Sequence, residues 1–153
     1  MLTLYTPQLE DLRFKEQMLG DAQTMSYNHA YGGTIPFPRE RWESWYKRWI
    51  LAPENHRFYR YVAEDTVFLG EVAYHWDEEL QIYMTDVIIF APHRGKGYGK
   101  QALLMLCEAA KARGIHTLYD NIAIDNPAIG LFTKCGFSEI SRTAESIFMK
   151  KDL

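Results

Sequence analysis

The residues best suited to chemistry lie in one basic, glycine-rich stretch, Arg94-Gly-Lys-Gly-Tyr-Gly-Lys100. The stretch follows a continuous apolar run, Val87–Phe90, whose length and β-branched character predict a buried strand, and it precedes a helical pattern. Alternating glycines open backbone conformations closed to other residues and let a ligand approach closely. The first N–H groups of the following helix lack partners inside the helix and lie at the positive end of its dipole. With Arg94, Lys96 and Lys100 around them, these groups predict a cradle for a diphosphate.

Two common phosphate-binding motifs do not fit this stretch. A P-loop needs a glycine, four residues and then Gly-Lys-Ser/Thr, but here Gly99-Lys100 is followed by Gln101 and preceded at that distance by Arg94. No hydroxyl group is therefore placed to hold magnesium. A dinucleotide fingerprint needs Gly-x-Gly-x-x-Gly, whereas this loop is Gly-x-Gly-x-Gly and lies late in the chain. The spacing disfavours both NTPases and dinucleotide-binding enzymes.

The stretch Arg94-Gly-Lys-Gly97-Tyr-Gly99 resembles the acyl-CoA pyrophosphate loop of the GNAT superfamily of N-acetyltransferases, (Arg/Gln)-x-x-Gly-x-(Gly/Ala). A second stretch, Asp125-Asn-Pro-Ala-Ile-Gly-Leu-Phe132-Thr-Lys-Cys-Gly-Phe137, resembles the family segment Asn-x-x-Ala-x-x-Leu-Tyr-x-x-x-Gly-Phe. Two positions differ. Asp125 stands at the usual asparagine, with Asn126 one step on, and Phe132 stands at the tyrosine that is thought to protonate the departing CoA thiolate.

This resemblance implies a GNAT fold and an acetyl-CoA-dependent N-acetyltransferase, with acetyl-CoA and an amine acceptor as its partners. The cofactor is expected along the end of the strand, the glycine loop and the second motif. The residues expected to bind it are Ile88, Ile89, Phe90, Arg94, Gly95, Lys96, Gly97, Tyr98, Gly99, Lys100, Asp125, Asn126, Phe132 and Lys134.

Acetyl transfer to an amine requires a base, because an amine with a reference pKa of about 10.4 is mostly protonated at neutral pH. Asp86, which directly precedes the cofactor strand, is the first candidate, followed by Glu71 and His75. Glu71 and His75 are four residues apart and share one face of a strand. For Asp86 a solvent-facing strand carboxylate is an equally good interpretation, and for His75 a surface histidine is the better one.

The resemblance to the GNAT superfamily also bears on two further roles, the donor that stabilises the oxyanion and the acid that protonates the leaving thiolate. A backbone N–H around Ile88–Phe90 is the inherited donor for the developing oxyanion. A thiolate with a reference pKa near 8.5 is a tolerable leaving group without a dedicated acid. Phe132 therefore weakens the case for an acid and does not abolish catalysis; Tyr98, Tyr119 or water remain alternatives.

Length and composition predict one domain, residues 1–153, of an ordinary soluble protein. Seventeen basic and twenty acidic residues give a formal charge of −3, which argues against a nucleic-acid binder. No apolar run predicts a membrane span or a signal segment, so a cytoplasmic location is expected. Cys107 and Cys135 lack metal-ligand spacing, as do the histidines, so reduced core cysteines and no metal are expected. A homodimer is left open.

The hydrophobic patterns predict an α+β fold, a mixed and largely antiparallel sheet flanked by helices. Trp42, Trp45, Tyr46, Trp49 and Ile50 form one helical face that we expect to pack on the sheet, with a part in acceptor binding as the alternative. The predicted strands are Leu2–Tyr5, Phe58–Ala63, Val67–Trp76, Gln81–Phe90, Ile115–Ile124, Phe137–Arg142 and Glu145–Lys150. The predicted helices are Pro7–Leu19, Pro38–Leu51, Tyr98–Arg113 and a short one after Pro127, with an irregular segment over 20–38.

The sequence thus predicts an N-acetyltransferase that transfers acetyl directly to a primary amine in a ternary complex. The acceptor is a small cationic metabolite or drug, or a protein N-terminus or lysine. A non-catalytic acyl-CoA-binding sensor is the alternative. Both predict CoA binding, but only the enzyme releases thiol when an amine is present.

Overall fold

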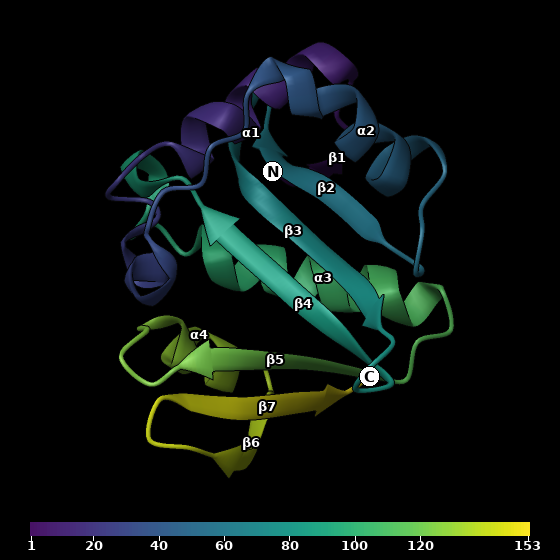
Figure 1. Ribbon diagram of the computed structural model, residues 1–153. Coiled ribbons are helices and arrows are strands. Elements are labelled where there is room, and N and C mark those ends of the chain that lie inside the picture. Colours follow the sequence, from purple (N-terminus) through teal and green to yellow (C-terminus); the bar gives the residue numbers. More distant parts are fainter.

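The computed structural model describes residues 1–153. Its centre is a seven-stranded sheet in the order β1-β2-β3-β4-β5-β7-β6 (Figure 1). Neighbouring strands are antiparallel, except that β4 and β5 run parallel. This arrangement confirms the predicted α+β fold. The strands are β1 (Leu2–Tyr5), β2 (Phe58–Glu64), β3 (Val67–Asp77), β4 (Ile82–Ile89), β5 (Thr117–Ala123), β6 (Ser138–Arg142) and β7 (Ser146–Asp152).

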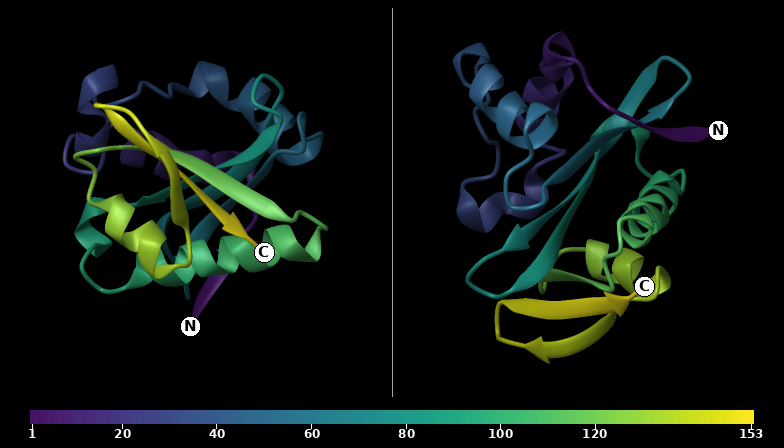
Figure 2. Two further views of the ribbon diagram at one scale, coloured as in Figure 1. Left: turned by 90° about the horizontal axis from the view of Figure 1, so that it is seen from below. Right: turned by 90° about the vertical axis from the view of Figure 1, so that its right-hand side faces the viewer.

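Four α-helices lie on the two faces of the sheet, α1 and α2 on one face and α3 and α4 on the other (Figures 1 and 2). They are α1 (Leu12–Leu19), α2 (Trp42–Tyr46), α3 (Tyr98–Ala112) and α4 (Ala128–Lys134). The shorter helical turns are η1 (Leu9–Asp11), η2 (Ser26–Tyr31), η3 (Arg39–Arg41), the π-helix η4 (Lys47–Leu51) and η5 (Ala91–His93). None of these helices combines the length and apolar character needed to cross a membrane.

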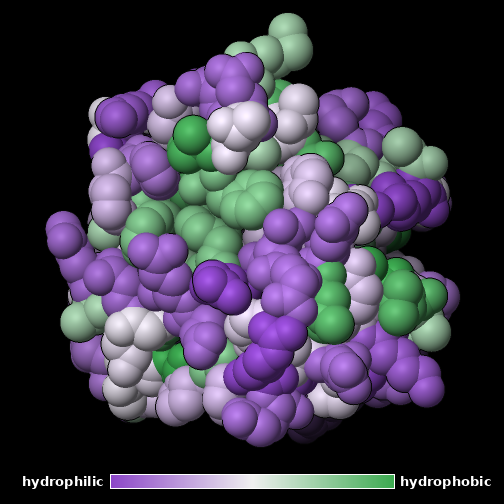
Figure 3. All heavy atoms as spheres, turned by 90° about the horizontal axis from the view of Figure 1, so that it is seen from above, coloured by the Kyte–Doolittle hydropathy of each residue, from purple (hydrophilic) through white to green (hydrophobic).

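Each face of the sheet has its own hydrophobic core, because side chains alternate along a strand. On β3, Val72 and Tyr74 pack in the core beneath α3, whereas Ala73 packs in the core beneath α1 and α2. Some apolar surface remains open on the side of the molecule that carries α1 and α2: in Figure 3, hydrophobic side chains gather in a hollow bordered by hydrophilic ones. The core beneath α1 and α2 positions the segment between them, residues 20–41, over one end of β4.

The helix predicted over Pro38–Leu51 is broken into three pieces, η3, α2 and η4, by changes of helical pitch. Its aromatic face packs on the sheet as predicted: Trp42 and Trp45 are buried, and the Trp45 ring meets Tyr59 edge-on at 4.7 Å. The irregular segment over 20–38 contains one short turn of helix, η2. The other predicted elements agree with the structure to within a few residues at their ends.

The sheet opens between β4 and β5. These two strands share a single register pair, Met84 with Tyr119, and the hydroxyl of Thr85 donates to the Tyr119 carbonyl at 3.2 Å. On the other side of β4, the backbone of β3 approaches closely at Gly70, where a Cβ atom would lie 2.1 Å from the Ile88 carbonyl oxygen. β4 is therefore held firmly by β3 and is free along its other edge.

Candidate active site

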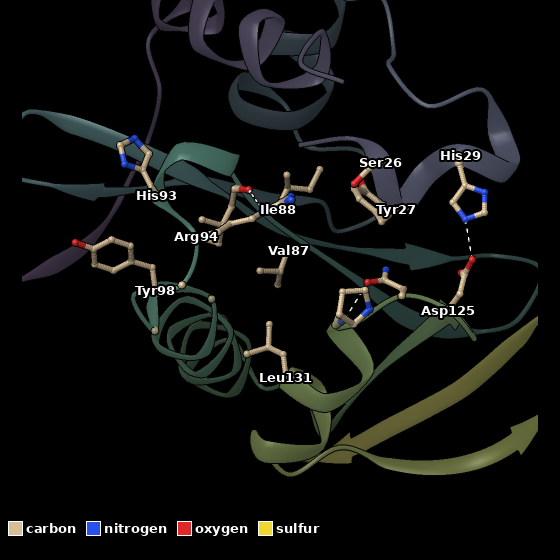
Figure 4. Close-up of a pocket in the computed structure, with 17 residues that line it drawn as sticks. Ser26, Tyr27, His29, Val87, Ile88, His93, Arg94, Tyr98, Asp125 and Leu131 are labelled. Carbon is tan, nitrogen blue, oxygen red and sulfur yellow. Dashed lines mark hydrogen bonds and ion pairs between the residues drawn. The ribbon is translucent and has the colours of Figure 1, made fainter. Parts of the chain in front are cut away.

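A cavity of about 490 Å³ occupies the opening between β4 and β5 (Figure 4). Its walls are the end of β4, the glycine loop and first turn of α3, the turn between β5 and α4, and η2 from the opposite side. The two stretches identified in the sequence, 94–99 and 125–131, thus meet around one space.

The glycine loop forms the wall at the start of α3. Gly95 and Gly97 each have a φ of +81°, a left-handed conformation that an L side chain adopts only with strain. Gly97 caps α3, so the first free N–H groups of this long helix lie at the cavity, where Gly95, Gly97, Tyr98 and Gly99 line it. Lys96 and Lys100 are exposed beside the loop and do not line the cavity. The local geometry suits an anionic group.

The side chain of Arg94, which is predicted to contact a phosphate, donates hydrogen bonds to backbone carbonyl groups. Its Nε donates to the Ile89 carbonyl at 3.0 Å, and its two terminal nitrogens donate to the carbonyls of Gln23 and Thr24 at 3.3 and 2.8 Å. The hydroxyl of Thr24, which is fully buried, accepts the N–H of Ala91 at 3.0 Å. Arg94 lines the cavity, but these contacts make it mainly a tie between β4 and the segment that carries η2.

The free edge of β4 supplies backbone groups to the cavity. Phe90 donates its N–H to the Leu69 carbonyl at 2.8 Å, toward β3. Because successive residues of a strand direct their N–H groups to opposite edges, the N–H of Ile89 faces the opening. Val87, Ile88 and Ile89 line the cavity, whereas Phe90 does not, and its ring packs against Phe14 at 5.7 Å.

Asp125 and Asn126 have separate roles at the start of α4. Asn126 accepts the N–H of Ala128 at 2.9 Å and so stabilises the first turn of α4. The Asp125 carboxylate lies 2.8 Å from Nε2 of His29 in η2 (Figure 4). Both residues line the cavity, so this pair closes its rim between η2 and the turn before α4.

Two residues of the second motif for which the sequence predicts cofactor binding do not line the cavity. Phe132 is buried in the core beneath the sheet, where its ring contacts Phe137 at 4.9 Å, and its neighbour Leu131 lines the cavity instead. Lys134 is exposed in the last turn of α4. The helix turns these two side chains away because only one face of α4 borders the opening.

Asp86 lies on β4 immediately before the cavity-lining residues. Solvent reaches its side chain, yet protein atoms surround it closely, as in a recess of the surface. This poor solvation and, second to it, the negative charge of Glu71 raise the pKa of Asp86, whereas Lys15 lowers it; the net result is a pKa of about 7. A carboxyl with this pKa can accept and release a proton near neutral pH.

The other two candidate bases are less available. The Glu71 carboxylate is buried and accepts hydrogen bonds from Lys15 at 2.9 Å and from the Tyr59 hydroxyl at 2.6 Å. His75 does not line the cavity; its Nδ1 is buried without a hydrogen-bond partner, and burial and the nearby Arg57 lower its pKa. Glu71 is held in an ion pair, and His75 is partly enclosed. Asp86 does not line the cavity either, but it directly precedes the lining residues of β4 and has a pKa near neutrality.

Sequence reasoning missed three polar residues of this region. Tyr27 in η2 lines the cavity, and burial and the charge of Asp86 raise its pKa. Asp120 on β5 has a pKa well above its usual value because of burial and the charge of Asp86. Lys15 on α1 is the third. Asp120-Asn121 inside a predicted strand was a usable signal, whereas nothing in the local sequence marks Tyr27 or Lys15.

The family comparison agrees with this geometry. The family model described as "Acetyltransferase (GNAT) family" matches residues 19–137. The chain belongs to the GNAT family. Two Bacillus subtilis (strain 168) relatives match shorter segments: "Uncharacterized N-acetyltransferase YobR" is 28% identical over 104 residues, and "Uncharacterized N-acetyltransferase YycN" is 41% identical over 66 residues. These matches cover 60% and 42% of this chain, and 42% and 41% of the relatives, so the aligned segments span less than half of their lengths.

Solved GNAT structures share the whole fold. Spermidine N-acetyltransferase from Vibrio cholerae, in complex with CoA and spermine, superposes with a TM-score of 0.82 at 21% identity and covers 99% of this chain and 95% of its own. The structure of yncA from Salmonella typhimurium with its cofactor acetyl-CoA gives a TM-score of 0.80 at 18% identity, covering 99% of this chain and 94% of its own. At these low sequence identities, the structural similarity shows that the chain shares the fold of these proteins and nothing more.

Proposed function

We propose that this GNAT protein is an acetyl-CoA-dependent N-acetyltransferase that acts on a primary amine. The observation that carries the proposal is the meeting of the glycine loop, the start of α3 and the free edge of β4 around one cavity. Asp86, whose pKa is about 7, lies on β4 one residue before the part of the strand that lines this cavity. Family membership and the CoA or acetyl-CoA in the neighbouring structures support the choice of donor.

The cavity fits the two ends of acetyl-CoA by their chemistry. The N–H groups at the start of α3 and the open backbone of Gly95 and Gly97 suit the pyrophosphate, and Lys96 and Lys100 add positive charge nearby. The pantetheine arm would lie between the edge of β4 and α4, where Val87 and Leu131 provide apolar walls. The thioester then lies next to Ile89 and within the reach of an amine approaching past Asp86.

The proposed reaction is a direct transfer. Asp86 accepts a proton from the acceptor ammonium, and the free amine attacks the thioester carbonyl, so that a C–N bond forms and the C–S bond breaks. The N–H of Ile89 stabilises the negative charge that develops on the carbonyl oxygen. The thiolate leaves and takes up the proton that the attacking nitrogen loses as it becomes an amide, giving CoA and the N-acetyl amine, and Asp86 then releases its proton to solvent. No protein atom becomes acylated.

The carboxylic groups around Asp86 favour a cationic acceptor. Asp86 lies within electrostatic reach of Glu71 and of Asp120. Glu71 is paired with Lys15 and burial favours the protonated form of Asp120, so an ionised Asp86 supplies the unpaired negative charge. Among the structural neighbours, one acts on spermidine, and another is named a ribosomal-protein-alanine N-acetyltransferase from Brucella melitensis. Small polycations and protein amines are therefore the first acceptors to test.

The test is thiol release from acetyl-CoA with a panel of polyamines, aminoglycosides, amino acids, and lysine or N-terminal peptides. Wild type is compared with Gly97→Trp, whose bulk and strained φ obstruct the loop. We expect release that depends on one class of amine and is lost in the variant. Acetyl-CoA binding by calorimetry with no turnover on any amine would favour the non-catalytic sensor, and no binding of acetyl-CoA at all would overturn the proposal.

A further inference from the structure

We propose that the buried ion pair between Lys15 and Glu71 is a positioning device that sets how strongly Asp86 holds its proton. The pair does not touch the cavity; it acts through Asp86 from beneath α1. The inference rests on the proposed function to the extent that Asp86 is the base of that reaction.

The pair is unusually enclosed for two full charges. The side chains of Lys15 and Glu71 are only 9% and 6% exposed, and Nζ lies 2.9 Å from Oε1. The ammonium group also lies over three aromatic rings, at 4.9 Å from Tyr59, 5.0 Å from Trp45 and 5.7 Å from Phe37. Tyr59 completes the site by donating its hydroxyl to the same carboxylate oxygen at 2.6 Å.

An ion pair in this position is a poor means of stabilising the core. Removing two charges from water costs as much as their attraction returns, and apolar side chains of similar volume often serve as well or better. The surroundings of Lys15 and Glu71 are a hydrophobic cluster that could have been completed with such residues. The pair therefore calls for an explanation beyond packing.

The sheet places Glu71 beside Asp86. Glu71 is paired in register with Ile88 and Ala73 with Asp86, so Glu71 is the diagonal neighbour of Asp86 on the same face of β3 and β4. Diagonal neighbours lie about 7–8 Å apart, and the small side chain of Ala73 leaves the path between the two carboxyl groups open. A fixed negative charge at this distance, largely shielded from water, favours the protonated form of Asp86.

The other groups facing Asp86 carry little charge near neutral pH. The pKa values of Tyr27 on η2 and Tyr59 on β2 are raised by burial, so both phenols stay neutral. Burial and Asp86 raise the pKa of Asp120 on β5 well above its usual value, and burial lowers that of His75 on β3. The Lys15–Glu71 pair is thus the main charged source acting on Asp86, and its negative member has the larger effect.

Glu71→Gln tests the device with little change of shape. Glutamine keeps an oxygen that can accept from both Lys15 and Tyr59, but it removes the negative charge and leaves the positive charge of Lys15 unbalanced. We expect Asp86 to titrate at a pH about one unit lower than in wild type. The double variant Lys15→Met with Glu71→Gln removes both charges. In it, Asp86 should titrate at a pH between those of wild type and the single variant Glu71→Gln. Glu108→Gln, the same chemical change at an exposed position of α3, is the matched control and should leave the titration unchanged.

Two readouts keep this inference separate from the proposed function. NMR titration of isotope-labelled aspartate carboxyl carbons, with Asp86→Asn to assign the signal, follows Asp86 without any turnover. The pH dependence of kcat/KM follows it during catalysis, where the acidic limb should move by the same amount. If Glu71→Gln shifts the NMR titration of Asp86 but the wild-type protein shows no turnover, the result supports the positioning role of the Lys15–Glu71 pair and contradicts the proposed acetyltransferase activity. An active Glu71→Gln variant in which Asp86 titrates as in wild type overturns the device, because a purely structural pair would lower the rate at every pH without moving the profile.

Discussion

Asp86 shows how a single carboxyl group acquires its properties from neighbours that the local sequence does not reveal. Ala73 lies opposite it, Glu71 lies diagonally beside it, and α1 supplies Lys15 from above. None of these contacts can be deduced from the residues next to Asp86 in the chain. Its position just before the cofactor strand was enough to name it a candidate, but only the assembled sheet gives it a pKa suited to proton transfer.

Gly70 is the residue on which the position of β4 depends most directly. In a Gly70→Ala variant the new Cβ would meet the Ile88 carbonyl oxygen at 2.1 Å and the Ile89 Cα at 2.9 Å, both backbone atoms that cannot turn aside. We expect the free energy of unfolding to fall by about 1–3 kcal/mol and acetyl-CoA binding to weaken, because β4 must move. Chemical denaturation and calorimetry measure the two effects.

Gly130→Ala is the control for that variant. Gly130 lies within α4, where a Cβ atom would meet nothing within 4 Å, and alanine is the better helix former. This variant should be as stable as wild type or up to about 1 kcal/mol more stable. Equal destabilisation of both variants would show that the close approach at Gly70 has no special importance.

At the scale of elements, Arg94 joins two segments that otherwise lie on opposite sides of the cavity. Arg94→Leu removes three hydrogen bonds to carbonyl groups, two of them on the turn before η2. We expect a loss of about 1–3 kcal/mol in stability and a raised KM for the amine acceptor, because η2 is no longer held against β4. Thermal unfolding and steady-state kinetics test this.

Lys96→Leu provides the comparison within the same loop. Lys96 is exposed and makes no hydrogen bond or ion pair, so its replacement should leave stability within about 0.5 kcal/mol of wild type. Its effect should be confined to a weaker, less salt-dependent affinity for acetyl-CoA. If both variants lose stability equally, Arg94 is not the tie that its contacts indicate.

The order and type of the elements could be predicted because they depend on short-range patterns. The apolar run before the glycine loop, the period of α3 and the alternation in β3 are all visible in the sequence, and both glycine-linked motifs border the observed cavity. The functions of Arg94 and Glu71 could not be predicted, since their partners lie about 70 and 56 positions away. The division of the helix predicted over 38–51 into three pieces could not be predicted either, because the changes in helical pitch leave the spacing of its aromatic face intact.

For the molecule as a whole, Asp86 connects activity with stability. Its pKa is about 7 in the folded protein and about 4 in an unfolded chain, so the folded state binds its proton more tightly. Between these values the unfolded chain releases the proton and the folded protein retains it, and the contribution of Asp86 to stability therefore falls as pH rises from about 4 to about 7. At pH 8 an ionised Asp86 in a poorly solvated recess is a cost to the fold.

Asp86→Asn should therefore be inactive and yet more stable than wild type at pH 8. The gain should be about 1–2 kcal/mol, less than the full shift in pKa suggests because solvent reaches the carboxyl, and it should vanish near pH 4. Denaturation curves across this range, together with the amine assay, measure both properties. A variant that is less stable than wild type at pH 8 would contradict the unfavourable environment assigned to Asp86.

The two separate hydrophobic cores have a consequence for how such a protein can evolve. The core beneath the sheet holds α3 and α4, which border the proposed cofactor site, and the core beneath α1 and α2 holds the aromatic face for which a part in acceptor binding is the alternative interpretation. Substitutions on opposite faces of a sheet share few partners, so their energetic effects are nearly additive. Acceptor preference can therefore drift through changes around α1, η2 and α2 while the acetyl-donor half is inherited intact. The main restriction on that drift is the small set of contacts, at Arg94, at Thr24 and between His29 and Asp125, through which the two halves meet.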